Sequence, residues 1–513
     1  MEHTSPGWLS NAIFYEIYPQ SFQDSNADGI GDLQGIIRRL DYIRDLGCNA
    51  IWMNPCFDSP FGDAGYDIRD YYRVAPRYGS NEDLRELFSA VHSMGMHIIL
   101  DLVPGHTSYQ HPWFQASMQA EENPYTHRYV WTDNGFAPPP EGFQTLRGIS
   151  DRNGAAVVNF FSIQPALNYG FFAPDPKEGW QQPMDAPGPT ATRQALQDIM
   201  RFWLGMGCDG FRVDMAGSLV KNDPDGRGTI ALWRQIRSFM DMEFPEAVLV
   251  SEWGEPDKAI AAGFDMDFLL HFGPSHFTDL YHCETPYFSE DTRGSAKAFF
   301  TKYRQLYHDT HGSGLICMIS GNHDMERMSH YLSDAEQRLA FTLLLTMPGA
   351  PFIYYGDEIG MRYQAGLPSK EGGFLRTGAR TPMQWDYTPN AGFSSAPPYD
   401  LYLPVDNSPG AVRALTQQQA TDSLRSEIAG LIRFRQAHRA LQSLGDITLI
   451  SDDVPLIYTR SCAEEVLTVI INPSDRPQML EISRKSILYT VGGSAELRDG
   501  HIMVPGVSAV ILA

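Results

Sequence analysis

Short apolar, β-rich runs alternate with amphipathic helical patterns along most of this 513-residue sequence, and this alternation is its strongest constraint on the fold. The runs cover residues 12–18, 50–53, 97–101, 210–214, 247–252, 266–270, 315–321 and 351–355. Helical patterns, among them 33–46, 81–94, 190–204 and 424–438, separate or follow them. Eight strands interleaved with helices predict a parallel sheet closed into a (β/α)8 TIM barrel.

Two departures from this alternation predict additional domains. The stretch between the third strand and the helix at 190–204 is rich in Pro, Gly and aromatic residues and is far longer than an ordinary βα loop. We expect an inserted subdomain at 105–170, which divides the barrel into residues 1–104 and 171–440. Short strand patterns at 447–450, 456–459, 466–471, 479–482 and 508–512 then predict a C-terminal antiparallel β-sandwich domain over 441–513.

The composition argues against several classes of partner. A formal net charge of −23 disfavours nucleic acid, which requires a basic surface, and suits a neutral ligand. No apolar run is long enough to cross a bilayer, and the first residues lack the pattern of a secretory leader. The six cysteines form no CxxC pair and lie among apolar segments, which indicates buried free thiols. We therefore expect a cytoplasmic monomer or small homo-oligomer with no membrane or nucleic-acid partner.

The segment DSNADGIGD (24–32), after the first expected strand, has the oxygen pattern of a calcium loop. Asp24, Asn26 and Asp28 alternate, the Ile30 carbonyl follows, and Asp32 closes the run. An EF-hand needs a Glu at its twelfth position, where a glycine stands, and an entering helix, where a strand is expected. The pattern therefore predicts a structural Ca²⁺ in a loop, and a polar turn without a metal is the alternative.

Three carboxylates stand at the ends of expected barrel strands, where the chemistry of such barrels takes place. Asp214 ends GFRVD, Glu252 ends VLVSE, and Asp324 follows MISGNH. An acid at the end of an apolar run is costly to desolvate unless it has a partner or a function. Arg212 lies two residues before Asp214, so it shares that side of the strand and could keep the acid ionised.

Two histidines join these acids. His106 follows the third strand and His323 precedes Asp324, although either one alone would more often be a structural residue. A metal cluster is the competing chemistry, but ligand spacing such as HExxH is absent. Several carboxylates around a pocket fit glycoside hydrolysis, in which one acid attacks and another protonates the leaving oxygen.

These segments together resemble the α-amylase superfamily, glycoside hydrolase family thirteen, along the whole chain. The matching blocks are DLVPGH (101–106), GFRVD (210–214), SE (251–252) and GNHD (321–324), with AGYDIRDY (64–71), QPALN (164–168) and RTPMQW (380–385). The resemblance implies a retaining mechanism with Asp214 as nucleophile, Glu252 as general acid/base and Asp324 as a transition-state stabiliser. It also implies that the sugar at the cleaved bond is held by Tyr66, Asp67, His106, Arg212 and His323.

The resemblance is strongest to the oligo-1,6-glucosidase and α-glucosidase branch. QPALN is similar to its QPDLN signature, and Arg376 matches an arginine that, with the counterpart of Asp67, clamps the terminal glucose in exo-acting relatives. The residue after the nucleophile often follows linkage preference in this branch, but Met215 is neither of its usual residues. The loop at 24–32 matches a structural calcium site of the same branch, whereas Gly105 replaces the Asn that a second calcium would need. No organic cofactor is expected.

We therefore predict an exo-acting, retaining α-glucosidase that cleaves α-1,4 or α-1,6 bonds at the non-reducing ends of short gluco-oligosaccharides. The alternatives are a glucosyl transferase or isomerase of the trehalose synthase or sucrose-active type, and an endo-acting α-amylase. A non-catalytic amylase-like interaction protein would lack the three acids and carry a membrane segment, so it is the weakest alternative.

Overall fold

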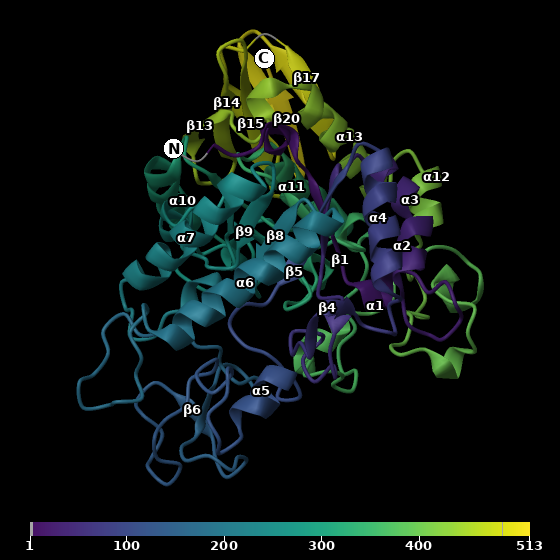
Figure 1. Ribbon diagram of the computed structural model, residues 1–513. Coiled ribbons are helices and arrows are strands. Elements are labelled where there is room, and N and C mark those ends of the chain that lie inside the picture. Colours follow the sequence, from purple (N-terminus) through teal and green to yellow (C-terminus); the bar gives the residue numbers. More distant parts are fainter. Residues whose placement is uncertain (1–3, 485) are drawn as a thin grey trace.

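The computed structural model describes residues 4–484 and 486–513, and its centre is a sheet of eight parallel strands (Figure 1). The strands are β1 (Phe14–Ile17), β2 (Ala50–Met53), β5 (His97–Leu102), β8 (Gly210–Val213), β9 (Val248–Ser251), β10 (Met266–Phe268), β11 (Leu315–Cys317) and β12 (Phe352–Tyr354). Their order is β11-β10-β9-β8-β5-β2-β1-β12. A parallel bridge between Ile319 and Phe352 joins the two edges, so the sheet closes. The predicted (β/α)8 barrel is confirmed.

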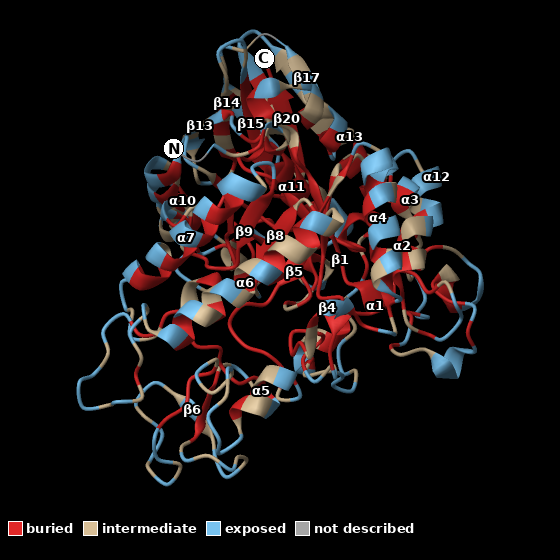
Figure 2. Ribbon diagram, viewed as in Figure 1, coloured by how far each residue is buried: buried red, intermediate tan, exposed pale blue. Residues whose placement is uncertain are grey.

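Helices cover the outside of this barrel. They are α2 (Leu33–Arg38), α3 (Leu40–Leu46), α4 (Asn81–Ser93), α6 (Pro187–Met206), α7 (Arg227–Glu243), α8 (Pro256–Ala261), α10 (Lys297–Thr310), α11 (Asp334–Thr346) and α13 (Leu424–Ala437). Shorter helices occupy loops: α1 (Pro19–Phe22), α5 (Pro112–Ser117), α9 (Thr278–Tyr281) and α12 (Ala414–Gln419). Figure 2 shows buried strands inside helices with exposed outer faces. Because both faces of the sheet are covered, its strands are apolar without alternation.

Local sequence explains where several of these helices begin and end. Ser80 and Asp83 form a capping box at the start of α4, and Ser333 and Glu336 form another at the start of α11. Each pair satisfies backbone N–H groups that have no partner inside the helix. Helix α3 ends at Gly47, whose φ of 108° favours a residue without a side chain.

The helix predicted at 33–46 is two helices, which is a correction. Helices α2 and α3 meet at Arg39, whose φ of −111° and ψ of 5° interrupt the helical backbone. Its guanidinium lies 4.2 Å from the ring centroid of Trp385 and donates to Gln23 Oε1 at 2.6 Å. The break therefore coincides with contacts to distant parts of the chain, which local periodicity does not reveal.

Two long loops project from the end of the barrel where the strands finish. The segment between β5 and α6 contains α5 and a small antiparallel pair, β6 (Gln144–Leu146) and β7 (Ala156–Val158). The loop after β2 forms a second antiparallel pair, β3 (Phe57–Asp58) and β4 (Asp70–Val74). Figure 1 shows α5 and β6 at the opposite end of the molecule from the C-terminal sheets. The exact boundaries of the inserted subdomain stay predictions.

The C-terminal part forms two antiparallel sheets. One has the order β13-β14-β15-β20-β17 and the other β16-β19-β18. The strands are β13 (Asp446–Ser451), β14 (Leu456–Ser461), β15 (Val466–Asn472), β16 (Gln478–Glu481), β17 (Ile487–Val491), β18 (Glu496–Arg498), β19 (His501–Val504) and β20 (Ser508–Leu512). An apolar cluster that includes Ile470, Ile502 and Val510 contains residues of both sheets. The sequence pattern missed β17, β18 and β19.

Two buried arginines, one in α13 and one in β14, bind the end of α11. Arg435, in α13, donates to the carbonyls of Leu345 and Met347 at the end of α11, both at 2.9 Å. Arg460, in β14, donates to the Thr346 carbonyl. The last carbonyls of a helix have no partners within it, so these guanidiniums satisfy groups that burial would otherwise leave unpaired.

Two further expectations concern buried free thiols and the absence of a segment that crosses a bilayer. All six cysteines are free thiols, but Cys283 and Cys462 are only half-buried. Within the described ranges, no helix combines the length and the apolar character that a bilayer crossing requires.

Candidate active site

Two of the three predicted acids directly follow barrel strands. Asp214 follows β8, and its backbone N–H donates to the Leu102 carbonyl at 2.9 Å. Glu252 follows β9, and its N–H donates to the Val213 carbonyl at 2.9 Å. These bonds extend the ladder of the sheet by one residue, so the barrel itself fixes the position of both acids.

A single buried guanidinium contacts both acids and a third carboxylate. Arg212, in β8, is only 1% exposed and donates from Nη1 to Asp101 Oδ1 at 2.7 Å and to Asp214 Oδ1 at 3.3 Å. Its Nη2 lies 2.7 Å from Glu252 Oε2. Because a guanidinium presents several donors in one plane, one side chain holds three carboxylates in a fixed arrangement.

Two of the carboxylates around Arg212, those of Asp214 and Asp101, have a raised pKa and bind protons more readily than acids in water. Burial, with the charge of Glu252, raises the pKa of Asp214 well above its ordinary value, although Arg212 opposes the rise. Burial also raises the pKa of Asp101 to about 6, again against Arg212. Closely spaced acids that share protons suit a reaction in which one carboxyl group is ionised while another is protonated.

Asp324, in the loop after β11, has a different environment. Arg376 Nη1 and Arg380 Nη2 both donate to Asp324 Oδ1, at 2.8 Å and 2.9 Å. Burial acts to raise the pKa of Asp324, but the charges of Arg380 and Arg376 oppose it, and the pKa lies well below its usual range. Burial lowers the pKa of His323 to about 3, so its ring is neutral near pH 7 and the arginines balance the charge of Asp324.

Hydrogen bonds fix both predicted histidines. His323 Nε2 lies 2.7 Å from the Tyr66 hydroxyl, and its Nδ1 lies 3.0 Å from Glu16 Oε1. His106 Nε2 lies 3.2 Å from the Tyr66 carbonyl, and its Nδ1 lies 3.3 Å from Asn159 Nδ2. Burial lowers the pKa of His106 to about 4, so this ring is also neutral near pH 7. Neutral rings held in place are suited to exchanging hydrogen bonds with an uncharged ligand.

The expected pairing of Arg376 with Asp67 is wrong, because the structure pairs Arg376 with Asp63. Arg376 Nη2 lies 3.5 Å from Asp63 Oδ1, and both side chains line the same cavity. The buried Asp67 carboxylate instead accepts hydrogen bonds from the backbone N–H groups of Gly62 and Asp63 and from the Ser59 hydroxyl. Asp67 therefore holds the loop that presents Asp63.

The backbone of this loop explains why the sequence suggested the wrong acid. Phe61, Ala64 and Gly65 have φ values of 60°, 51° and 95°, so the chain turns sharply between Ser59 and Asp67. Adjacency to Tyr66 in the sequence therefore does not place a side chain beside Tyr66 in space. Burial raises the pKa of Asp63 to about 6, with Arg376 opposing the rise.

The cavity between these groups has a volume of about 440 Å³. Predicted residues in its wall are Tyr66, His106, Asp214, Glu252, Asp324 and Arg376. The wall also includes Met215, which follows the predicted nucleophile in the sequence. Residues in its wall that the sequence analysis did not single out are Asp63, Phe160, Phe161, His271, Phe272 and Phe374. The aromatic ones lie in loops, where no periodic pattern marks them. Charged and aromatic side chains together suit a sugar, which presents both hydroxyl groups and apolar C–H faces.

Two acids that support the site, Glu16 and Asp101, were also not predicted. Glu16 lies within β1 and contacts His323, and Asp101 lies within β5 and accepts hydrogen bonds from the Trp52 indole and the Tyr66 hydroxyl. An acid inside an apolar strand is a signal that could have identified both, since its burial needs a polar partner.

The carboxylates of the loop at 24–32 accept hydrogen bonds mainly from backbone N–H groups. Asp24 Oδ2 accepts hydrogen bonds from the Gly29 N–H at 2.9 Å and from the Ser394 hydroxyl at 2.6 Å. Asp32 Oδ1 accepts from the Gly35 N–H at 2.7 Å and so caps α2. Over the described part of the chain, no group of three or more His, Cys, Asp or Glu side chains is arranged to hold a metal ion. Calcium in this loop stays a prediction, and the function proposed below does not use it.

Chelation tests that prediction. If Asp24, Asn26, Asp28, Asp32 and the Ile30 carbonyl hold Ca²⁺, EDTA should lower the melting temperature by roughly 2–8 °C, because binding to the folded state alone stabilises it. Glucose release at ambient temperature should change little. Asp28→Ala should melt at the same lower temperature and no longer respond to EDTA. A melting temperature that neither EDTA nor Asp28→Ala changes would show that the loop holds no structural metal.

Comparison with known proteins gives one family. The family model described as "Alpha amylase, catalytic domain" matches residues 16–443. Among curated proteins, "Trehalose synthase/amylase TreS" of Mycobacterium tuberculosis is 32% identical, over 98% of this chain and 88% of its own length. "Oligo-1,6-glucosidase" of Heyndrickxia coagulans is also 32% identical, over 91% of this chain and 92% of its own length.

A solved structure extends the likeness to the fold. The trehalulose synthase MutB from Pseudomonas mesoacidophila MX-45 superimposes with a TM-score of 0.83 at 25% sequence identity. The match covers 99% of this chain and 100% of that one. The likeness therefore includes the barrel, the segment between β5 and α6 and the C-terminal sheets.

Proposed function

This chain belongs to the alpha-amylase family and is a glycoside hydrolase, and from that premise we propose that it is a retaining, exo-acting α-glucosidase. It would release single glucose units from the non-reducing ends of short gluco-oligosaccharides. The observation that supports this best is the cavity of about 440 Å³ that Asp214, Glu252 and Asp324 share with the Asp63–Arg376 pair.

The arrangement of Asp214 and Glu252 supports a double displacement. In the first step an Asp214 oxygen bonds to the anomeric carbon, the glycosidic C–O bond breaks, and Glu252 gives its proton to the leaving oxygen. In the second step water attacks the same carbon, Glu252 takes the proton from that water, and the bond to Asp214 breaks. Arg212 contacts both carboxylates and positions them for these opposite roles.

The remaining polar groups would bind the sugar ring in the same cavity. Asp324 stays ionised beside Arg376 and Arg380, so it would stabilise the positive charge that develops on the ring in the transition state. The neutral ring of His106, together with Tyr66, would exchange hydrogen bonds with its hydroxyl groups. The fully buried His323 would act behind them, by holding the Tyr66 hydroxyl in place. Such contacts are strongest where water is excluded.

The anomeric form of the first product tests this proposal. Two displacements at one carbon retain its configuration, so glucose released from an α-linked substrate should first appear as the α-anomer. Proton NMR during the first minutes of turnover distinguishes the two anomers, and a solution of pure α-glucose provides the rate of spontaneous mutarotation. Initial β-glucose would contradict the proposed mechanism.

The pair of Asp63 and Arg376 supports the exo-acting part of the proposal. Its planar donors and acceptors match neighbouring hydroxyl groups of a terminal sugar. Arg376→Ala should lower kcat/KM on short oligosaccharides by roughly ten- to a thousandfold, as for the loss of a charged hydrogen-bonding partner. It should also reduce the preference for terminal over internal bonds, measured as the ratio of glucose to longer products from maltoheptaose.

Arg362→Ala is the matched control for that experiment. Arg362 is an exposed arginine whose hydrogen bonds run to Ser408, Pro409 and Gly410, and it does not line the cavity. Its replacement should leave both kcat/KM and the product ratio close to the wild type. Rapid loss of starch viscosity with the wild type, with mixed oligosaccharides as early products, would contradict exo-action.

Glucosyl transfer or isomerisation is a second candidate, which the names of a trehalose synthase and a trehalulose synthase among the similar proteins support. The same carboxylates would form the glucosyl intermediate, and a sugar hydroxyl would replace water in the second step. Chromatography of products from maltose, isomaltose, sucrose and trehalose separates the candidates. Free glucose as the main product supports hydrolysis, and a new disaccharide supports transfer.

A further inference from the structure

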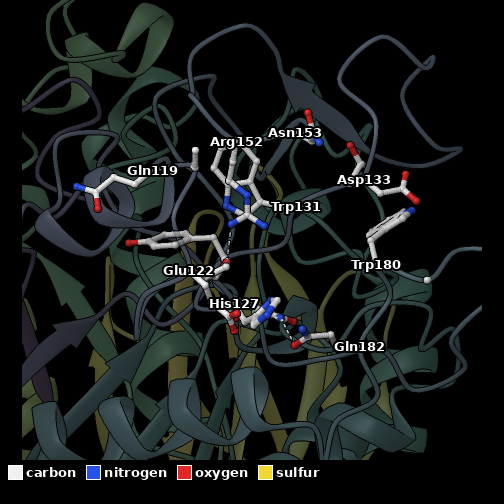
Figure 3. A pocket seen from close by; sticks show the side chains of 15 residues that line it. Gln119, Glu122, His127, Trp131, Asp133, Arg152, Asn153, Trp180 and Gln182 are labelled. Carbon is white, nitrogen blue, oxygen red and sulfur yellow. Dashed lines mark hydrogen bonds between the residues drawn. The ribbon is translucent and has the colours of Figure 1, made fainter.

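A second cavity lies in the segment between β5 and α6 (Figure 3). Its volume is about 480 Å³, against about 440 Å³ for the candidate active site, and the two share no lining residue. We propose that this cavity is a second, non-catalytic binding site for a neutral oligosaccharide. The choice of ligand rests on the proposed function. The existence of the site rests on the side chains that line the cavity.

One wall is built from alternating residues of an extended segment. Tyr129 pairs with Leu167 and Trp131 pairs with Ala156 in antiparallel bridges. Side chains alternate along such a segment, so Tyr129 and Trp131 both face the cavity while Val130 packs into an apolar cluster on the other side. The cavity wall is therefore supported by backbone pairing and by packing behind it.

A guanidinium that lacks an acidic partner lies against this wall. Arg152 is 4.8 Å from the ring centroid of Trp131, and Figure 3 shows the two side chains together in the centre of the cavity. Arg152 Nη1 donates to the carbonyls of Ser117 and Thr126, at 3.1 Å and 2.7 Å. Within residues 4–484 and 486–513, Arg152 forms no ion pair. Its Nε and Nη2 donors therefore remain for a ligand.

A buried donor of the same wall is also unused. Trp131 is 5% exposed, and its indole N–H has no hydrogen-bond partner among the described residues. A buried polar group without a partner costs free energy. Solvent does not reach this N–H, so the polar contacts available to a ligand come from Arg152 and from the exposed residues of the lining.

Exposed polar side chains form the rim. Gln119, Glu122, Asp133 and Asn153 line the cavity, and no side chain among them has a hydrogen bond or an ion pair within the described part of the chain. The amides can donate hydrogen bonds to neighbouring hydroxyl groups and accept them, and the carboxylates can accept them. The carboxylates of Glu122 and Asp133 and the Arg152 guanidinium give the lining both signs of charge, which favours a neutral ligand over a strongly charged one.

Trp180 supplies a flat apolar surface at one end. Figure 3 shows its ring beside Asp133, and its indole N–H donates to Glu178 at 2.5 Å. The ring packs edge-on against Phe171, with centroids 5.4 Å apart. Free hydroxyl-binding groups next to an aromatic face are the combination that a sugar ring requires, since its hydroxyl groups and its C–H face need different partners.

The cavity is coupled to the loop that carries His106. The Tyr129 hydroxyl lies 2.8 Å from the Thr107 hydroxyl, and the Leu167 N–H donates to the Gly105 carbonyl at 3.1 Å. Both contacts run from the segment that forms the cavity wall to residues flanking His106. An oligosaccharide in this cavity would therefore sit on the same supporting segment as the candidate active site.

Hydrogen–deuterium exchange tests the proposal directly. The inactive Asp214→Asn protein, incubated with maltotriose, should show slower exchange in peptides covering residues 119–133 and 152–153, as well as in peptides of the candidate active site. In Asp133→Ala/Asn153→Ala on the same background, the concentration of maltotriose needed for protection at 119–133 should rise at least about fivefold, because polar contacts are lost. Protection at the candidate active site should persist.

A matched control replaces Gln144 and Asp151, exposed residues of the same segment that do not line the cavity, with alanine. It should keep both regions of protection. Protection confined to the candidate active site, protection unchanged in Asp133→Ala/Asn153→Ala, or protection by glucuronate but not by maltotriose would each overturn the second site. Glucose release by the wild type is measured separately, so failure of the second site is distinguishable from failure of the proposed function.

Discussion

Asp214→Asn is expected to lower kcat on maltose or isomaltose by roughly 10⁴-fold or more, because the amide has no charge with which to attack the anomeric carbon. The variant should remain folded, since Asn matches Asp in shape. It should even melt at a higher temperature at pH 7. Burial and Glu252 raise the pKa of Asp214, so its ionised form destabilises the folded state once the pH exceeds the pKa of the unfolded chain.

The stability gain should therefore shrink as the pH falls towards 4, where Asp214 is protonated in the folded protein and increasingly protonated in the unfolded chain as well. Glu252→Gln is the companion variant: it should lose turnover of natural oligosaccharides but retain part of its activity on aryl glucosides, whose leaving groups need no proton. Activity close to the wild type in Asp214→Asn would refute the assignment of the nucleophile.

Arg212→Met is expected to lower the free energy of unfolding by about 3–5 kcal/mol at pH 7, the range for removing one partner of a buried ion pair. It leaves Asp101, Asp214 and Glu252 buried together without the guanidinium that contacts all three. The loss should be smaller at pH 5, because protonation then relieves the repulsion between the acids. Denaturant unfolding at the two pH values measures both effects.

Arg69→Ala is the control for that experiment. Arg69 pairs with Asp58 at 2.8 Å but is 40% exposed, so its removal should cost no more than about 1 kcal/mol. An Arg212→Met protein as stable as the wild type at pH 7 would contradict the role of Arg212. If Arg212→Met lowers the free energy of unfolding by the same amount at pH 5 and at pH 7, Arg212 stabilises the fold by packing and not by its charge.

The sequence predicted the parts of the site that the barrel itself fixes. Asp214 and Glu252 end apolar strands, and a closed parallel barrel places all such ends on one face. Arg212 follows from the alternation of side chains in β8. These positions depend on regular backbone, whose geometry is the same in every barrel.

Residues in loops could not be predicted in this way. The sequence suggested Asp67 as the partner of Arg376, whereas the structure pairs Arg376 with Asp63. Positive φ values at Phe61 and Ala64 turn the chain sharply in this loop, and no sequence pattern shows such turns. Phe160 and Phe161 in the wall of the candidate active site lie in the long segment between β5 and α6, and the bridges of that segment join residues far apart in the sequence. The break at Arg39 has the same origin, since a distant tryptophan lies beside it.

The contacts of Arg435 and Arg460 have a consequence for synthesis of the chain on the ribosome. Helix α11 precedes the last barrel strand, but the carbonyls of Leu345, Thr346 and Met347 at its end accept hydrogen bonds from the side chains of residues 435 and 460, which come much later in the chain. While those residues are still inside the exit tunnel, we expect the nascent chain to expose these carbonyls to water, together with the apolar surface that the C-terminal sheet later covers. The end of α11 would therefore reach its buried, hydrogen-bonded state only after β14 has emerged.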